Sequence, residues 1–323
     1  MIKHQNAVKT LDMKKLLCKI NIILLKYHMT KIDHQFVNSE CLEKEIKSAD
    51  CVVLDCSWYL PETGKQGFDD FLEGHIPGAR YLDLDRVSDK RSKYVNMVPT
   101  ADQFAAEMSA LGISNQTSVV VYDAGYVSAR IWWMFRLFGH DRVRILDGGW
   151  RKWKSEGRPV ESGPSRPHAL GSFTAVPREG WVADWREVLA AVKGGSPNLV
   201  DARTPERYSG AMSSGYPGVP GGHIPGAVNA PWSKFMDAAA GYAFVSPESA
   251  EVILRDVGVD LDKPVIVTCG SGVTAAIIAL MLERTGRVAY RIYDGSWHEW
   301  GQRADLPKTS VQSQTASDSS EST

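Results

Sequence analysis

The chain contains an internal repeat, and this repeat constrains the fold more than any other feature. The sequence His-Ile-Pro-Gly-Ala occurs at 75–79 and again at 223–227, and Asp-Gly-Gly-Trp at 147–150 returns as Asp-Gly-Ser-Trp at 294–297. The two copies in each pair are about 147 residues apart. Two further pairs of segments match at similar spacing: 52–55 with 198–201, and 119–123 with 265–269. Four ordered matches indicate two copies of one folding unit, and 323 residues suffice for two domains of ordinary size.

Each copy alternates short apolar runs with helical segments. The runs are rich in Val and Ile and end in polar residues or glycine, which is typical of buried parallel strands. Helices are predicted over Ser128–Phe138 and Val273–Thr285, where Gly139 and Gly286 are placed to cap them. This alternation predicts an α/β fold of two tandem domains, each a parallel sheet flanked by helices.

The composition along the chain sets the predicted domain boundaries. We expect an N-terminal domain at 33–154 and a C-terminal domain at 178–306. A linker is predicted at 155–177, because its first part is crowded with Gly, Pro and Ser. The last segment, 307–323, has almost no apolar content and is predicted to be a disordered tail. The remaining 1–32 is a separate basic extension.

The N-terminal extension bears on localisation. Its first 31 residues carry seven lysines and one aspartate around the apolar stretch Leu16–Leu25, which Lys19 interrupts. This stretch is too short and too charged to span a bilayer, and no small-residue cleavage site follows it. We therefore expect a cytoplasmic protein. Two alternatives stay open: a mitochondrial location if 1–32 is a targeting peptide, and a true start at Met29.

Charge and cysteine usage exclude several classes of partner. Thirty-seven basic residues nearly balance 38 acidic ones, so neither nucleic acid nor an anionic membrane is an expected partner. The five cysteines are an odd number without a Cys-x2-Cys pair, which argues against a zinc site and a disulfide scaffold. A reduced compartment is expected, where a thiol stays available for chemistry.

One cysteine lies where a strand of the second copy meets a helix. The segment Thr268–Ala275 reads Thr-Cys-Gly-Ser-Gly-Val-Thr-Ala. We expect Gly270 and Gly272 to let the backbone curl, so that N–H groups and the helix N-terminus point at the Cys269 sulfur. Such a setting favours a thiolate and holds a persulfide anion, so Cys269 is the predicted nucleophile. The other four cysteines lack such a loop and are interpreted as structural: Cys18, Cys41, Cys51 and Cys56.

The loop resembles that of the 3-mercaptopyruvate sulfurtransferases, a branch of the rhodanese family with the signature Cys-Gly-Ser/Thr-Gly-Val-Thr. The resemblance covers about residues 50–305 and includes both His-Ile-Pro-Gly segments and both Asp-Gly-x-Trp segments. It implies tandem rhodanese-like domains of which the C-terminal one is catalytic. Asp123 stands where Cys269 lies in the other copy, and an aspartate cannot carry a sulfane sulfur.

The resemblance also favours one sulfur donor. Relatives that use thiosulfate have basic side chains in the loop, whereas 270–272 here reads Gly-Ser-Gly. The implied small-molecule donor is 3-mercaptopyruvate, with thiosulfate as the alternative. Arg207 is the implied clamp for the donor carboxylate, and its alternative role is a surface ion pair. Arg203 is expected to form a structural salt bridge. The implied substrate contacts within the loop are Gly270, Gly272 and Val273.

Two hydroxyls are predicted to assist the chemistry. We expect Ser271 and Thr274 to pass a proton to the departing pyruvate enolate or to hydrogen-bond it, with helix capping as their alternative role. A thiol acceptor such as thioredoxin, a small thiol or cyanide then removes the sulfur. No metal or organic cofactor is required.

The sequence departs from the family pattern near the predicted site. Tyr216 stands where relatives often have a second substrate-binding arginine, and Gln66 where some have an aspartate proposed to pair with the first His-Ile-Pro-Gly histidine. That histidine, His75, is either a relay residue or the organiser of a turn, the role also expected of His223. His298 replaces a small polar residue and is predicted to lie on the surface.

Two other function classes compete with sulfur transfer. A phosphatase of similar shape needs Cys-x5-Arg, but Ala275 occupies the arginine position. A non-catalytic binding module would have a substituted cysteine, which holds for the first copy and not for the second.

Overall fold

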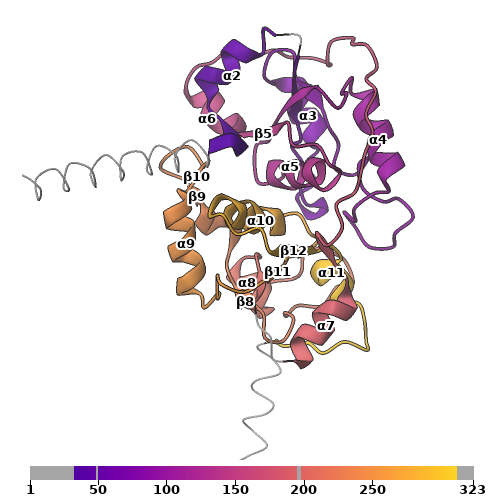
Figure 1. Ribbon diagram of the computed structural model, residues 1–323, viewed down its shortest axis with the longest axis vertical. Coiled ribbons are helices and arrows are strands. Elements are labelled where there is room, and N and C mark those ends of the chain that lie inside the picture. The colour runs from indigo at the N-terminus through magenta and orange to yellow at the C-terminus, as the bar shows by residue number, and fades with distance from the viewer. Residues whose placement is uncertain (1–32, 49, 195–197, 311–323) are drawn as a thin grey trace, which may run out of the picture.

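The computed structural model describes residues 33–48, 50–194 and 198–310. These residues form two domains of similar construction, one above the other in Figure 1. The predicted basic extension at 1–32 and residues 311–323 of the predicted tail lie outside the described residues.

Each domain is built on a five-stranded sheet whose neighbouring strands all run parallel. The order is β1-β5-β4-β2-β3 in the first domain and β6-β12-β11-β7-β8 in the second, which is the same topology used twice. The first sheet comprises β1 (Phe36–Val37), β2 (Cys51–Asp55), β3 (Arg80–Tyr81), β4 (Ser118–Tyr122) and β5 (Val143–Leu146). The second comprises β6 (Val182–Ala183), β7 (Leu199–Asp201), β8 (Val228–Asn229), β11 (Val265–Thr268) and β12 (Tyr290–Tyr293). The predicted α/β class with two parallel sheets is confirmed.

Helices flank both sheets. Those of the first domain are η1 (Asp33–Gln35), α2 (Ser39–Glu45), η2 (Pro61–Thr63), α3 (Gly67–Glu73), α4 (Ala101–Ala110), α5 (Ser128–Leu137) and α6 (Gly149–Ser155). Those of the second are α7 (Trp185–Lys193), α8 (Pro205–Ser209), η3 (Trp232–Phe235), α9 (Pro247–Asp256), α10 (Ala275–Arg284) and α11 (Ser296–Trp300). No helix within these described segments has the length and apolarity needed to cross a bilayer.

The two domains meet along α5 and α10, which pack against each other (Figure 1). Both helices are buried along nearly their whole length, which explains why they carry apolar residues on every side. Their side chains join the two sheets into one continuous core. Both predicted helices are confirmed, but α10 begins at Ala275 rather than at Val273 because the preceding residues form the cysteine loop.

The linker is tied to the first domain, and the first residues of the predicted disordered tail are ordered. Backbone hydrogen bonds tie the linker to the first domain: Gly171 N–H donates to Ser109 O at 2.8 Å, and Val176 N–H donates to Phe138 O at 3.0 Å. Residues 307–310 are also ordered against the second domain, since Thr309 and His223 exchange backbone hydrogen bonds of 2.8 and 3.0 Å. Low apolar content did not prevent this, because the backbone supplies the contacts.

The second domain has an antiparallel hairpin with no counterpart in the described part of the first. It consists of β9 (Met236–Asp237) and β10 (Ala243–Phe244). The hairpin contacts the first domain, where the Phe244 N–H donates to Asp147 Oδ1 at 3.1 Å. It lies over the loop that follows β4 and leaves there a cavity of only about 10 Å³.

Candidate active site

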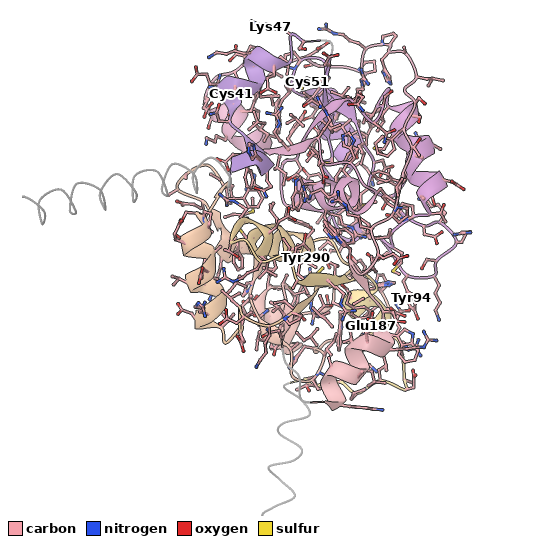
Figure 2. All side chains as sticks on the ribbon, in the orientation of Figure 1. Cys41, Lys47, Cys51, Tyr94, Glu187 and Tyr290 are labelled. Atoms are coloured by element: carbon pink, nitrogen blue, oxygen red, sulfur yellow. The ribbon has the colours of Figure 1, made fainter. Side chains whose placement is uncertain are left out.

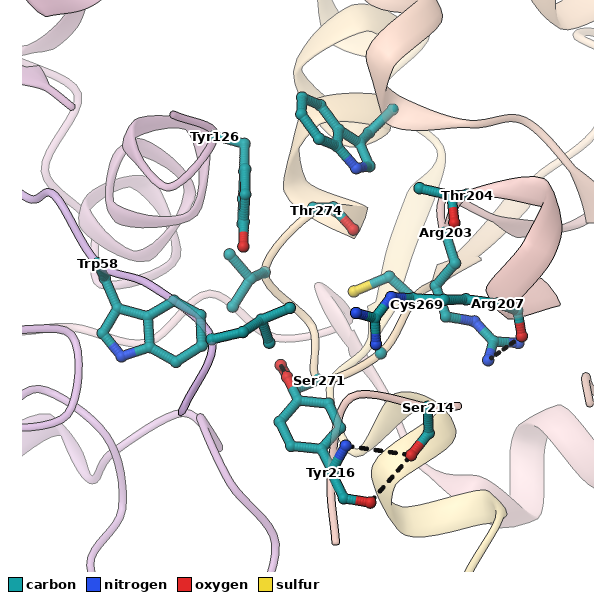
Figure 3. Close-up of a pocket in the computed structure, with 14 residues that line it drawn as sticks. Trp58, Tyr126, Arg203, Thr204, Arg207, Ser214, Tyr216, Cys269, Ser271 and Thr274 are labelled. Atoms are coloured by element: carbon teal, nitrogen blue, oxygen red, sulfur yellow. Dashed lines mark hydrogen bonds between the residues drawn. The ribbon is translucent and has the colours of Figure 1, made fainter. Parts of the chain in front are cut away.

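A larger cavity, of about 170 Å³, lies at the carboxyl end of β11, between the two domains. The carboxyl edge of a parallel sheet is where such sites are expected. In Figure 3 the Cys269 sulfur points into this cavity. The first domain contributes three lining residues: Trp58, Leu60 and Tyr126. The second contributes the loop together with Arg203, Thr204, Arg207, Ser214, Tyr216 and Trp232.

The cysteine is fixed by the second Asp-Gly-x-Trp segment. The Cys269 N–H donates to Ser296 Oγ at 3.1 Å, and the Cys269 carbonyl accepts from the Trp297 N–H at 3.0 Å. Cys269 is 1% exposed, so it is shielded from bulk solvent, and it lines the cavity. The repeated motif therefore positions the predicted nucleophile.

The two loop glycines have different roles. Gly272 has φ +78°, and a Cβ there would lie 3.0 Å from Asp294 O and 3.2 Å from Arg130 Nη1. A side chain at this position is therefore excluded. Gly270 has no positive φ, and a Cβ there would make an ordinary contact of 3.4 Å with Tyr216. The prediction that both glycines are needed to curl the backbone is thus right for Gly272 and wrong for Gly270.

The equivalent loop of the first domain shows what this backbone can bind. The Asp123 carboxylate accepts hydrogen bonds from the N–H groups of Gly125 and Ser128. Burial raises the pKa of Asp123, and these N–H groups act in the opposite direction because they favour the anion. The first loop is therefore an anion receptor filled by its own side chain.

The corresponding N–H groups of the second domain belong to Ser271 and Thr274. Among the described residues, none accepts a hydrogen bond from either of them. The Thr274 hydroxyl makes no capping hydrogen bond to α10 either, so the capping alternative for Thr274 is wrong. The second loop thus leaves unpaired the N–H groups that are occupied in the first. The expected N–H hydrogen bonds to the Cys269 sulfur are not among the hydrogen bonds of the described residues.

Ser271 lies in a polar cluster that the sequence did not predict. Its hydroxyl is 2% exposed and lies 2.9 Å from Asn96 Nδ2 and 2.7 Å from the Tyr216 hydroxyl. Burial raises the pKa of Tyr216 well above its usual range, so this phenol keeps its proton. Asn96 comes from the first domain, which thereby contacts the cysteine loop of the second.

The two arginines of the cavity are engaged differently. Arg203 forms the predicted salt bridge with Asp201, at 2.6 Å between buried groups. Arg207 lines the cavity and pairs with Glu62 of the first domain, whose side chain is 41% exposed. Since Glu62 is partly solvated, a carboxylate that enters the cavity can displace it more easily than any group could displace Asp201.

The candidate relay histidine lies elsewhere. The His75 ring stacks on Phe71 with centroids 3.9 Å apart, and its Nδ1 donates to Phe71 O at 2.8 Å. His223 makes the same contacts with Tyr208, at 3.8 and 2.9 Å. Neither histidine is among the described residues that line the cavity. Both therefore organise equivalent turns, and the relay role predicted for His75 has no support in this geometry.

Gln66 and His298 are two further residues that depart from the family pattern. Gln66 precedes α3 as its N-cap residue and does not line the cavity within the described part of the chain. The prediction that His298 lies on the surface is wrong. It is buried beside Tyr216, with ring centroids 5.0 Å apart, and burial lowers its pKa. The docked first domain covers this position, which the sequence of the second domain does not reveal.

The described cysteines other than Cys269 lie outside the cavity. In Figure 2, Cys41 and Cys51 lie in the outer part of the first domain, whereas Tyr94 lies beside the second. Burial raises the pKa of Cys51 to about 11 and that of Cys56 well above its usual range, so both thiols stay protonated. These properties fit the structural role predicted for them.

Sequence reasoning missed the residues that the first domain supplies to the cavity. Trp58 and Tyr126 follow β2 and β4, so their place at the carboxyl edge of the first sheet could have been inferred. Nothing in the sequence indicated that this edge faces Cys269.

Comparisons with known proteins agree with this arrangement. The family model of the rhodanese-like domain matches residues 38–156 and 184–303. The 3-mercaptopyruvate sulfurtransferase of Rattus norvegicus is 40% identical over 270 residues, which cover 82% of this chain and 90% of the relative. The thiosulfate sulfurtransferase of Bos taurus is 42% identical over 264 residues, covering 80% and 87%.

A solved structure extends the agreement to three dimensions. SseA from Escherichia coli, whose structure was described with the fold and mechanism of 3-mercaptopyruvate sulfotransferases, superposes with a TM-score of 0.74 at 32% identity. The match covers 81% of this chain and 98% of SseA. With two copies of the domain matched and relatives aligned over most of its length, the chain belongs to the rhodanese family.

Proposed function

We propose that the chain is a sulfurtransferase that takes sulfur from 3-mercaptopyruvate onto Cys269 as a persulfide and passes it to a thiol. One observation carries the proposal. The first loop surrounds the Asp123 carboxylate with N–H groups, while the second leaves the same N–H groups free beside a thiol that faces a cavity. An anionic sulfur on Cys269 fits those donors as the carboxylate fits its own.

In the first step, the Cys269 thiolate attacks the sulfur of the donor. An S–S bond forms, the C–S bond breaks, and the electron pair moves to carbon as the enolate of pyruvate. The proton of the donor thiol, released as the persulfide ionises, balances the protonation of the enolate to pyruvate. Ser271 and Thr274 hydrogen-bond the enolate oxygen or pass this proton, a role supported by their position in the cavity lining.

In the second step, a thiolate acceptor attacks the outer sulfur of the persulfide. The acceptor leaves as a persulfide and Cys269 returns as a thiolate. Thioredoxin, a small thiol and cyanide are suitable acceptors, and cyanide yields thiocyanate. The reaction needs neither a metal nor an organic cofactor.

The charges of the cavity favour a donor with one negative charge. Arg203 is neutralised by buried Asp201, which leaves Arg207 as the exchangeable cation among the described lining residues. One arginine suits the single carboxylate of 3-mercaptopyruvate better than the two charges of thiosulfate. Thiosulfate is the second candidate donor, because the bovine thiosulfate sulfurtransferase is equally similar to this chain.

The test compares both donors on the purified chain. We expect 3-mercaptopyruvate to yield pyruvate and, with cyanide, thiocyanate, and to leave one added sulfur atom on the Cys269 peptide by mass spectrometry. Cys269→Ser abolishes both signals. Cys56→Ser is the matched control, because Cys56 is an equally buried thiol outside the cavity. Equal rates with thiosulfate would refute the donor assignment, and sulfur found on another residue would refute the nucleophile.

The cellular location depends on whether residues 1–32 act as a targeting peptide. We propose that they do not and that the protein is cytoplasmic. Relatives include a mitochondrial protein of Arabidopsis thaliana, so import is the alternative. Fluorescent fusions with and without residues 1–32 distinguish the two. Mitochondrial signal that requires this segment would overturn the cytoplasmic assignment.

A further inference from the structure

Asn96 is a residue of the first domain that touches the loop of the second. It is 4% exposed and adopts φ +58°, a left-handed conformation that asparagine tolerates better than most residues. Its Nδ2 lies 2.9 Å from Ser271 Oγ. An unusual backbone conformation and a buried contact across the domain boundary coincide at this one residue.

A buried ion pair holds Asn96 in place. Arg130 of α5 donates from Nη2 to the Asn96 carbonyl at 2.7 Å and to Asp294 Oδ1 at 2.6 Å. Its Nη1 reaches the Gly272 carbonyl at 3.4 Å. The other Asp294 oxygen accepts from the Val98 N–H at 2.7 Å. The same fully buried guanidinium therefore fixes both Asn96 and the backbone of the cysteine loop.

The direction of the Asn96–Ser271 hydrogen bond limits where the serine hydroxyl can donate. An amide NH2 group can only donate, so Ser271 Oγ must accept from Asn96. The Tyr216 hydroxyl donates to the same oxygen. A hydroxyl oxygen has two acceptor sites, and once both are filled its own hydrogen must point away from both donors. The cavity that Ser271 lines offers a direction that neither donor occupies.

We infer that Asn96 is a positioning residue, which acts through Ser271 by forcing the serine hydroxyl to donate into the cavity, where negative charge develops on the departing enolate. The inference rests on the proposed function. It assigns to the non-catalytic domain a direct part in arranging the reaction, beyond covering the site.

Asn96→Asp tests the polarity with almost no change in shape. Aspartate also tolerates the left-handed conformation, so the fold is retained. Its carboxylate accepts from Ser271 and turns the hydrogen away from the enolate. We expect kcat for pyruvate release to fall by about 10- to 100-fold with KM nearly unchanged, because the lost interaction exists only in the transition state.

Asn96→Gly is the companion variant, since it keeps the left-handed backbone and removes the donor without reversing it. We expect a smaller loss in kcat than for Asn96→Asp. The loss in Asn96→Asp should also shrink at low pH, where the protonated carboxyl donates again. The ratio of variant to wild-type kcat isolates this effect, because both proteins share the surrounding titratable and charged groups: Tyr94, Arg130, Tyr216, Asp294 and His298.

A Ser271→Ala background completes the test. If Asn96 acts through the serine hydroxyl, Asn96→Asp changes kcat no further once that hydroxyl is gone. Equal losses in both backgrounds, a ratio independent of pH, or equal losses for Asn96→Asp and Asn96→Gly would each overturn the inference. Mass spectrometry of the wild-type Cys269 peptide separates this failure from that of the proposed function. If this peptide gains no sulfur from 3-mercaptopyruvate, the proposed function fails whatever the Asn96 variants do.

Discussion

Arg207 is the residue that the proposed function assigns to donor binding. Its side chain is 15% exposed and faces the cavity, so a hydrogen-bonded carboxylate there is largely shielded from water. Such a charged contact contributes roughly 1.5–3 kcal/mol. We expect Arg207→Ala to lower kcat/KM for 3-mercaptopyruvate by about 10- to 150-fold, mainly through KM. Steady-state kinetics check this, and circular dichroism confirms the fold. Unchanged kinetics would refute the clamp.

His298 makes stability depend on pH. Burial lowers its pKa, so the unfolded chain binds a proton there more readily than the folded protein does. Its contribution to stability is present above the ordinary histidine pKa of about 6.5 and is lost as pH falls through the lower folded value. We expect the unfolding free energy of the wild type to fall more between pH 8 and pH 5 than that of His298→Gln. Urea denaturation at both values measures it. Parallel losses would show that the imidazole is not the cause.

At the scale of single residues, the sequence predicted the roles that depend on neighbouring residues in the chain. Cys269 follows a strand and precedes a helix, and Arg203 lies two residues after its partner Asp201, so both roles could be inferred from neighbouring residues. Asn96 contacts the cysteine loop and Tyr126 lines the cavity beside it, although both lie more than 140 residues away from the loop in the chain. These positions require the docked domains, and the resemblance suggested only His75 of the first domain, as a possible relay residue.

At the scale of elements, the short η2 turn carries the ion-pair partner of Arg207. This partner is Glu62, and in the proposed function it competes with the donor carboxylate for the Arg207 guanidinium. A partly exposed ion pair contributes about 0.2–1 kcal/mol, so we expect Glu62→Gln to lower KM for the donor by at most about fivefold. Glu206→Gln is the control, because Glu206 is an exposed carboxylate on the same helix as Arg207. An equal change in both variants would indicate general electrostatics instead of competition.

The longer elements were predictable, and the short ones were not. The Val-rich strands β4 and β11 and the helices α5 and α10 follow from apolar runs and capping glycines. Strands of two residues, such as β3 and β8, carry too little pattern for any periodicity to appear. The η2 turn, which holds Glu62, is equally short and was missed for the same reason.

For the whole molecule, the buried pair of Arg130 and Asp294 links the domains. Removing one partner leaves the other charge buried and unpaired, which costs about 3–5 kcal/mol. We therefore expect Arg130→Met to lower the unfolding free energy by about that amount in urea denaturation. Arg178→Met is the control, since its partner Asp141 is 56% exposed, and there we expect less than about 1 kcal/mol. Similar losses in both variants would contradict this role for the buried pair.

The duplication was predictable at this scale because each copy keeps the residues that its own turns require. The repeated histidines stack and donate in the same way in both domains, so both were retained. The docking of the domains was not predictable, because the residues on α5 and α10 that form it read as ordinary core. Trp58 and Tyr126 of the first domain line the cavity as a result of that docking.

The hairpin over the first loop has an evolutionary consequence. Exchanging Asp123 for cysteine would recreate a nucleophile, yet the roughly 10 Å³ beneath β9 and β10 admits no donor molecule. A second catalytic site there would require both a cysteine at position 123 and a displaced hairpin. Because either change alone gives no activity, selection favours neither. The duplicated ancestor has thus become committed to one working centre per chain.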